Sequence, residues 1–122
     1  MSPTERTLER LKFMNRKCGI VERFIHNRKV KGGIRSDLFG IFDIVALCPE
    51  GGIVGVQSCG DDYAAHFKKI TVKKADNAAD WLNAGGKIEL WSWRKVKEKR
   101  GGSGKRMIWQ PRIAEITIAD IQ

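Results

Sequence analysis

An apolar stretch in the first half of the chain, residues 38–47 (LFGIFDIVAL), constrains the fold more than any other feature. Its β-branched and aromatic residues are typical of a buried strand. Residues 49–52 (PEGG) are typical of a turn, and a second apolar segment follows directly at residues 53–57. The spacing therefore predicts a β-hairpin over residues 38–57.

Changes in the period of apolar residues predict the other elements. In chain order they are a helix at 4–17, a strand at 20–26, a basic turn at 27–33, the hairpin, helices at 61–70 and 75–84, and strands at 87–96 and 107–117. The two helices are separated by a kink or a true boundary at Thr71 and Val72. This order favours an α/β domain with a mixed sheet flanked by helices. At this length we expect a single domain, residues 1–122, with a basic hairpin at about 94–106.

Several classes of protein are excluded by composition. The apolar stretch is too short to span a bilayer, and the first residues form no apolar segment, so we expect neither membrane association nor a secretory signal. The three cysteines, Cys18, Cys48 and Cys59, contain no C-x-x-C pair, which argues against a disulfide framework and a closed zinc site. Free thiols favour a reducing compartment, and we expect the protein in the cytoplasm.

The charge balance favours a polyanionic partner. The chain has 23 Lys and Arg against 14 Asp and Glu, a formal net charge of +9. Such a domain attracts polyanions, most commonly nucleic acid, and the alternative is a soluble basic protein with solvated lysines. Two basic clusters are expected to contact phosphates. The first is Arg28, Lys29, Lys31 and Arg35, and the second is Arg94, Lys95, Lys97, Lys99, Arg100, Lys105 and Arg106.

Three tryptophans, Trp91, Trp93 and Trp109, lie on the predicted strands around the second basic cluster. One or two of them are candidates for stacking on bases or at a branch point. The alternative is that they belong to the core. The two basic clusters could flank one cleft.

Asp43 is the most informative single residue, because it interrupts the apolar stretch. A lone carboxylate in a buried strand is costly unless it is paired or binds a metal. Alternation puts it on the side of Ile41 and Val45, which favours a functional role over exposure to solvent. Gln57 ends the second strand of the hairpin and shares a face with Cys59. Across the hairpin that face would meet Asp43, and an ordinary strand end is the alternative.

The segment FDIVALCPEGGIVGVQSC resembles the PD-(D/E)XK nuclease superfamily, above all Holliday-junction-resolvase-like and VRR-NUC-like small phage or bacterial proteins. There one strand supplies an Asp and the next supplies Glu-x-Lys after an apolar run. Asp43 matches the Asp, Gln57 the Glu and Cys59 the Lys, and the resemblance covers about residues 4–95. It implies a restriction-endonuclease-like core, a mixed central sheet flanked by helices in the order α-β-β-β-α-β-β.

The resemblance also implies an activity: a metal-dependent DNA endonuclease that hydrolyses phosphodiester bonds, with branched DNA as a candidate substrate. Mg²⁺ or Mn²⁺ would polarise the phosphate and activate water, with Asp43 and the amide oxygen of Gln57 as ligands. A lysine from the following helix would replace the missing Lys. Lys69 is the candidate, and its neighbour Lys68 is the alternative and a candidate DNA contact. Both could instead be plain surface lysines.

Further expectations follow from the same resemblance. Glu22 is the candidate for the earlier acidic residue of the family, with Glu9 as the alternative, and Asp37 is expected to cap or brace the basic turn. Resolvase-like nucleases cut two phosphodiesters, which implies a homodimer that binds DNA. A phage-encoded protein would act in the bacterial host cytoplasm.

Other functions stay open. If no lysine reaches the site, the chain would be a non-catalytic DNA-binding protein on the same fold. A phage-encoded protein-binding inhibitor that mimics or blocks a nucleic-acid partner is a third possibility. Cys59 with His66 would suggest a thiol nucleophile or half a zinc site, but no pattern for a base or an oxyanion hole accompanies them. His26 and His66 are therefore expected to be surface or hydrogen-bonded histidines.

Overall fold

The computed structural model describes residues 1–27, 29–98 and 106–122. The elements are α1 (Pro3–Phe13), β1 (Lys17–Ile20), β2 (Arg23–Asn27), β3 (Val30–Ser36), β4 (Ile44–Leu47), β5 (Ile53–Cys59), α2 (Tyr63–Lys68), a π-helical turn η1 (Lys69–Lys73), α3 (Ala75–Asn83), β6 (Lys87–Lys97), β7 (Met107–Ile116) and a 3-10 turn η2 (Ile118–Asp120). No helix among these elements is long and apolar enough to cross a membrane.

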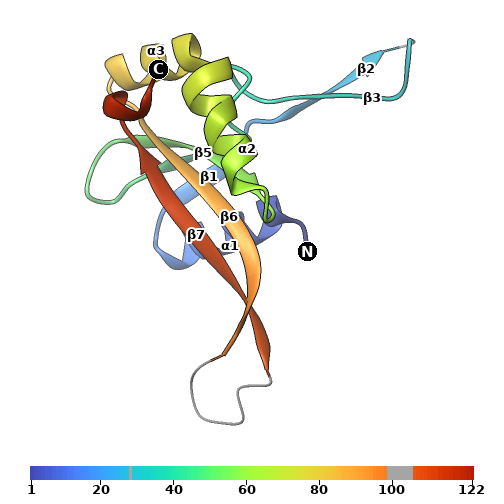
Figure 1. Ribbon diagram of the computed structural model, residues 1–122, viewed down its shortest axis with the longest axis vertical. Helices are drawn as coiled ribbons and strands as arrows, with labels where there is room; N and C mark the ends of the chain where they lie inside the picture. The colour runs from blue at the N-terminus through green and yellow to red at the C-terminus, as the bar shows by residue number, and fades with distance from the viewer. Residues whose placement is uncertain (28, 99–105) are drawn as a thin grey trace.

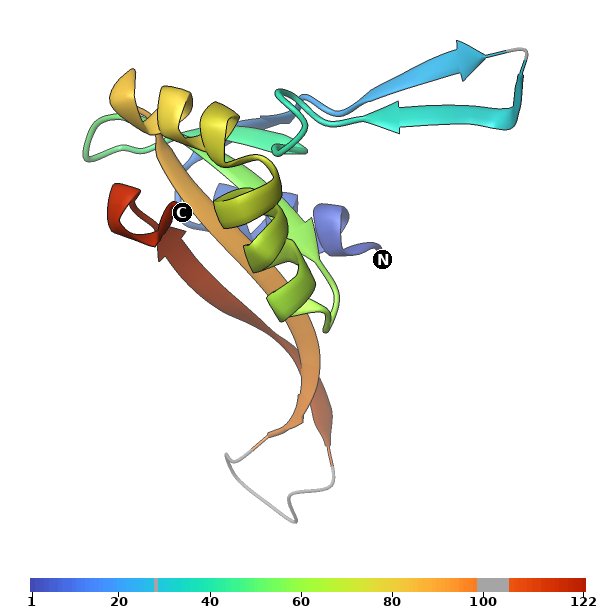
Figure 2. The same cartoon turned by 45° about the horizontal axis from the view of Figure 1, so that its top comes forward.

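Five strands form one mixed sheet in the order β1-β4-β5-β6-β7. Neighbouring strands are antiparallel except β5 and β6, which are parallel. A parallel pair needs a long crossover, and α2, η1 and α3 provide it (Figure 1). The remaining strands, β2 and β3, form a separate hairpin that projects from the body (Figure 2). The prediction of an α/β protein with a mixed sheet and flanking helices is confirmed.

Both faces of the sheet are covered, α1 lying on one and α2 with α3 on the other (Figures 1 and 2). The α1 face buries Leu11 against Val56 and Trp91. The opposite face buries Ile70 and Ala78 against residues of the sheet. A strand covered on both faces is apolar on both, which explains why β5 is buried along nearly its whole length.

The apolar stretch at residues 38–47 is a strand only in its second half, β4. Its first half is a tight turn in which Phe39 and Gly40 adopt positive φ, 57° and 71°. The end of the turn is buried: Ile41 and Phe42 are fully inaccessible, and the Phe42 ring lies 4.7 Å from that of Trp81, whereas Phe39 is 53% exposed. Burial rather than strand pairing accounts for Ile41 and Phe42, and the turn leaves Asp43 directly before β4.

The N-terminal third departs furthest from the predictions. Helix α1 ends at Phe13 instead of residue 17, because the chain turns at Asn15, where φ is 60°. The strand predicted at residues 20–26 is divided between β1 and β2, which belong to different sheets. The basic turn predicted at residues 27–33 is largely the strand β3.

The second half follows the predictions closely. The hairpin of β4 and β5 is confirmed, with Leu47 opposite Ile53 across the turn. The break between the two helices is the π-helical turn, in which Lys74 N–H donates to Lys69 O at 2.8 Å. Strands β6 and β7 pair over their full length. Most of the charged loop predicted between them, residues 99–105, lies outside the described residues.

Gly55 provides a test of the packing between β5 and the buried turn. A Cβ at this position would lie 2.6 Å from the Phe42 ring. We therefore expect Gly55→Ala to lower the free energy of unfolding by about 1–3 kcal/mol, the usual cost of overpacking a core. Gly19→Ala is the control, since nothing lies within 4 Å of its Cβ position. Urea unfolding measures both, and equal stability of the two variants would contradict this packing.

Candidate functional site

Asp43 occupies a fixed and buried position at the start of β4. Its exposed fraction is 5%. The backbone N–H of Ser58 on β5 donates to both carboxylate oxygens at 3.2 Å. The backbone of Asp43 is held on both sides, donating to Val56 O at 3.1 Å and accepting from Val21 N at 2.9 Å. The backbone bonds fix the residue at the end of the sheet, and turning the carboxyl group away would break its hydrogen bonds with Ser58.

Burial raises the pKa of Asp43 from its ordinary value of 3.8 to about 7. Loss of solvation is the main cause, and the hydrogen bond from Ser58 opposes it only in part. The negative charges of Asp37 and Glu22 raise the pKa further. Near neutral pH this carboxyl group holds a proton that a cation could replace.

A polar network lies beside Asp43 and links two of the predicted catalytic residues. Gln57, 2% exposed on β5, donates from Nε2 to Asp37 Oδ2 at 3.3 Å. Lys69 Nζ donates to the same oxygen at 3.3 Å. His66 Nδ1 lies 3.1 Å from Gln57 Oε1. Asp37 thus joins Gln57 to Lys69, while Lys68 is exposed on α2.

Asp37, which we expect to cap or brace the basic turn, also makes contacts with distant residues. Its carboxylate accepts hydrogen bonds from residues 20 and 32 positions away in the sequence. No local pattern around Asp37 signals contacts of that span. The only hint was its proximity in sequence to Asp43, on the same buried turn.

Glu22 and Asp43 line one open groove of about 620 Å³, together with Ser58 and the first turn of α1. Glu22 also forms an ion pair with Arg35 at 3.6 Å. Gln57 and Lys69 lie outside the lining of this groove. Glu9, the alternative acidic residue, lines a different groove.

Ser58 is itself held by a buried network that sequence reasoning missed. Its hydroxyl donates to Thr7 Oγ1 at 3.0 Å, and Trp93 Nε1 donates to the same oxygen at 2.9 Å. Thr7 in turn donates to Pro3 O at 2.8 Å. These bonds tie α1 to β5 and β6 and hold the strand that supplies the donor to Asp43.

The sequence predicts that Asp43 and the Gln57 amide hold one cation. The structure does not line one groove with both: Asp43 lies in the groove beside α1, whereas Gln57 is outside that lining and its amide oxygen faces His66. Within residues 1–27, 29–98 and 106–122, one group of three Asp, Glu, His or Cys side chains has its ligand atoms within 4.8 Å of one another. It consists of Cys59, Asp62 and His66. The sequence pointed to Cys59 and His66 but missed Asp62.

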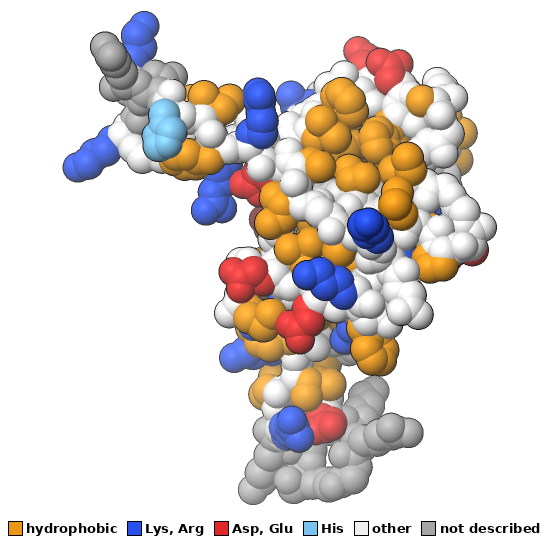
Figure 3. Space-filling model, turned by 180° about the vertical axis from the view of Figure 1, so that it is seen from behind, with side chains coloured by type: hydrophobic (Ala, Val, Ile, Leu, Met, Phe, Trp, Pro, Cys, Tyr) orange, Lys and Arg blue, Asp and Glu red, His pale blue; other side chains and the backbone are white. Residues whose placement is uncertain are grey.

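The predicted DNA-contacting residues lie at two separate places. Lys31 and Arg35 lie on the projecting β2–β3 hairpin, where Figure 3 shows Lys and Arg side chains among hydrophobic ones. The exposed side chains of Arg94, Lys95, Lys97 and Arg106 lie on or beside the outer half of β6 and β7. These two projections point in different directions (Figure 1). Lys29 is exposed at the hairpin turn, and Arg28, Lys99, Arg100 and Lys105 lie outside the described residues.

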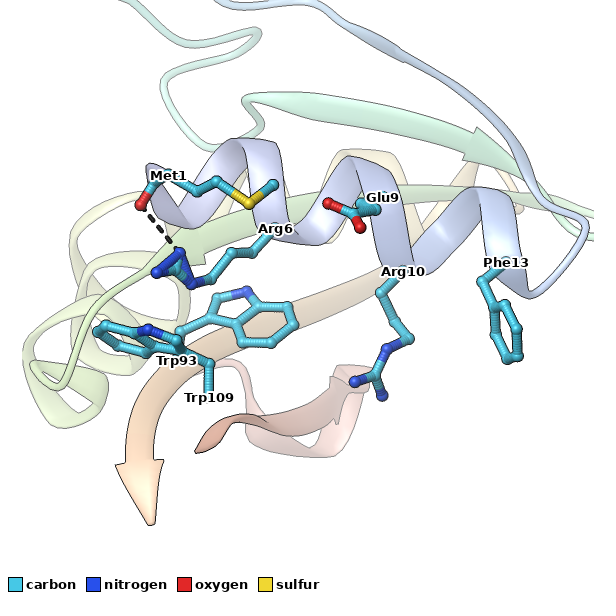
Figure 4. Close-up of a pocket in the computed structure, with 7 residues that line it drawn as sticks. All are labelled: Met1, Arg6, Glu9, Arg10, Phe13, Trp93 and Trp109. Carbon is cyan, nitrogen blue, oxygen red and sulfur yellow. Dashed lines mark hydrogen bonds between the residues drawn. The ribbon is translucent and has the colours of Figure 1, made fainter. Parts of the chain in front are cut away.

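Of the three tryptophans on β6 and β7, only Trp109 is at the surface. Trp91 and Trp93 are 0% and 4% exposed and belong to the core, whereas Trp109 is 43% exposed. The Arg6 guanidinium lies 4.0 Å from the centre of the Trp109 ring, and Lys95 Nζ lies 5.3 Å from it. Figure 4 shows this aromatic and cationic groove between α1 and the sheet.

Comparisons with protein-family models, curated proteins and solved structures find no significant match to this chain. Function is therefore inferred from the geometry of the site. The site contains the buried carboxyl group of Asp43, whose pKa is raised, with the charges of Asp37 and Glu22 acting on it. The Asp37 carboxylate joins Lys69 to the side-chain amide of Gln57.

Asp43→Asn tests the burial of this carboxyl group. The folded protein keeps the Asp43 proton up to about pH 7, whereas the unfolded chain loses it near pH 3.8. The protonated carboxyl group therefore stabilises the fold fully below pH 3.8, the pKa in the unfolded chain. This stabilisation is lost as the pH rises to about 7, the pKa in the folded protein, and beyond. We expect wild type to lose a few kcal/mol relative to Asp43→Asn over this range, at about 1.4 kcal/mol per pKa unit.

Urea unfolding across the range measures the difference. Asp80→Asn, which changes an exposed carboxylate on α3, is the control and should follow wild type. Parallel pH profiles for wild type and Asp43→Asn would contradict the raised pKa.

Proposed function

We propose that the chain is a metal-dependent DNA endonuclease with a restriction-endonuclease-like core, and that branched DNA is its substrate. The observation that carries the proposal is the buried carboxyl group of Asp43, whose pKa is about 7 beside Asp37 and Glu22. The charges of Asp37 and Glu22 oppose a negative charge on Asp43, and a cation bound at Asp43 would relieve this repulsion. The PD-(D/E)XK resemblance implies the order α-β-β-β-α-β-β. The structure has five strands instead of three between α1 and α2, and the proposal draws on the part of the order that it keeps: a first helix, the antiparallel β4–β5 pair, and a helical crossover to β6.

Oxygen donors fit a hard divalent cation such as Mg²⁺ or Mn²⁺. When bound, such an ion polarises the phosphate and lowers the pKa of an attacking water. Asp43 would hold it as the anionic ligand, with the Gln57 amide oxygen as a weaker second ligand. Lys69 would turn from Asp37 toward the scissile phosphate, where its ammonium group orients water and stabilises developing negative charge.

The surrounding charges fit a DNA substrate. Lys31 and Arg35 on the β2–β3 hairpin, and Arg94 and Lys95 on β6, would bind phosphates on either side of the site. Cutting a four-way junction requires two phosphodiester cleavages, so the proposal includes a homodimer acting in the cytoplasm.

A non-cleaving DNA-binding protein is the second candidate, and specific contacts favour it. Both ends of the Gln57 amide are engaged, by Asp37 and His66, and Lys69 is paired with Asp37. Burial raises the pKa of the Cys59 thiol to about 11, so this position supplies a neutral group where the family has an ammonium group. Cleavage therefore depends on freeing Lys69.

A cleavage assay separates the two candidates. Plasmid DNA and synthetic four-way junctions are incubated with Mg²⁺ or Mn²⁺. We expect Asp43→Ala to reduce cutting by more than about 100-fold, because even outer-shell partners of metal ligands contribute 10–100-fold. Lys69→Ala should reduce it by about 10²–10³-fold, as is usual for a group that stabilises transition-state charge.

Asp80→Ala and Lys12→Ala, two exposed positions on α3 and α1, are the matched controls and should cut like wild type. Tight DNA binding without cutting in either metal would favour the second candidate. Weak binding without a steep salt dependence would favour a protein-binding inhibitor instead.

Trp109 and Lys95 should affect DNA binding in different ways. Trp109→Ala is expected to weaken binding to junction or single-stranded DNA by about 1–3 kcal/mol, the usual contribution of base stacking, without changing the salt dependence. Lys95→Ala should reduce the slope of log K against log salt by about 1, as the loss of one phosphate contact predicts. Ile113→Ala, another exposed residue of β7, is the control. Fluorescence anisotropy at several salt concentrations measures all three, and identical slopes for Lys95→Ala and wild type would contradict the phosphate contact.

A further inference from the structure

The end of β5 and the start of α2 bring together three side chains of different chemistry. Cys59 is the last residue of β5 and is 4% exposed. Asp62 directly precedes α2, and His66 lies one turn further along that helix. The Cys59 sulfur, an Asp62 oxygen and a His66 nitrogen all lie within 4.8 Å of one another.

The hydrogen bonds of Gln57 determine which nitrogen of His66 carries a proton. Gln57 Nε2 donates to the carboxylate of Asp37, so Gln57 Oε1 is the atom that faces His66. This oxygen can only accept, and His66 Nδ1 must therefore be the donor. In the neutral imidazole, His66 Nε2 then carries a lone pair.

That lone pair faces another acceptor. His66 Nε2 lies 3.0 Å from Asp62 Oδ2, and two acceptors at this distance repel each other unless a cation lies between them. A proton on the imidazole would bridge these two atoms only. The Cys59 sulfur beside them is a third atom with a lone pair that can bind a metal ion. Three such atoms around one point are the arrangement expected at a metal site.

We propose that Cys59 Sγ, Asp62 Oδ2 and His66 Nε2 bind a Zn²⁺ ion, with a fourth position open to solvent. Sulfur, nitrogen and oxygen together are ligands that zinc accepts and that Mg²⁺ does not. Ligand atoms around one zinc ion stand about 3–4 Å apart, so small side-chain rotations complete the site. Three protein ligands with an open fourth position are typical of zinc sites that activate a bound water.

The surroundings suit this ion. The side chains of Asp62 and His66 are 57% and 25% exposed, which leaves a route from solvent. The thiol of Cys59 gives up its proton to solvent when it binds the metal, and the ion replaces that proton. Gln57 orients the His66 ring as an outer-shell partner of the kind that zinc-bound histidines usually have. The site requires neither DNA nor Mg²⁺ and so does not depend on the proposed nuclease function.

Metal titration of the full, chelator-treated chain tests the proposal. We expect one Zn²⁺ per chain, and a Co²⁺ complex whose spectrum contains a thiolate-to-metal charge-transfer band. Cys59→Ser and His66→Gln should each weaken zinc binding by at least about 100-fold, since loss of an outer-shell partner alone typically costs 10–100-fold. Gln57→Leu should weaken it by about 10–100-fold and keep the charge-transfer band.

Cys48→Ser and His26→Gln are the matched controls and should bind zinc like wild type. Because Cys59 is buried, circular dichroism and urea unfolding check each variant. His66→Gln, at a partly exposed position, keeps the test valid if Cys59→Ser does not fold. A Co²⁺ spectrum without the thiolate band, or zinc affinity unchanged in His66→Gln, would overturn the proposal.

Discussion

The backbone N–H of Ser58 is the contact on which the candidate active site depends. It donates to both oxygens of the Asp43 carboxyl group, at the point where β4 begins beside β5. The same residue uses its hydroxyl to bind Thr7, and through Thr7 it is tied to α1 and β6. The position of the buried carboxyl group therefore depends on the packing of α1, whose first turn lines the same groove as Asp43. The backbone N–H groups of Ser58 and of Asp43 itself offset only part of the lost solvation, and the pKa of Asp43 stays high.

The last residues of β5 supply two different chemical environments because successive side chains point to opposite faces of the sheet. Ser58 faces α1, where it takes part in the buried hydroxyl network. Gln57 faces α2 and joins His66 and Asp37. One short strand thus connects the oxygen-rich surroundings of Asp43 with the cluster of Cys59, Asp62 and His66. Gln57 bonds to His66 in this cluster and to Asp37, whose charge raises the pKa of Asp43, so a change in one environment is expected to affect the other.

Sequence and structure agree where local patterns decide the outcome. The β4–β5 hairpin, the helices that cross over to β6 and the β6–β7 pair all follow from apolar periodicity and turn residues. They disagree at residues 38–42, where an apolar run indicates burial but not backbone conformation. Buried turns and buried strands have similar composition, and the positive φ at Phe39 is not visible in the sequence. The division of residues 20–26 between two sheets was missed for the same reason, since pairing partners are chosen by distant residues.

The sequence by itself determined that this is a basic α/β protein with a carboxyl group in its apolar interior, because composition and periodicity act within a few residues. Only the tertiary structure decided what surrounds that group. Asp37 joins Gln57 and Lys69 across separations of 20 and 32 residues, and Thr7 meets Ser58 across 51. The pKa of Asp43 and the protonated nitrogen of His66 depend on these contacts. They follow from how the chain packs, and neighbouring residues in the sequence carry no signal of them.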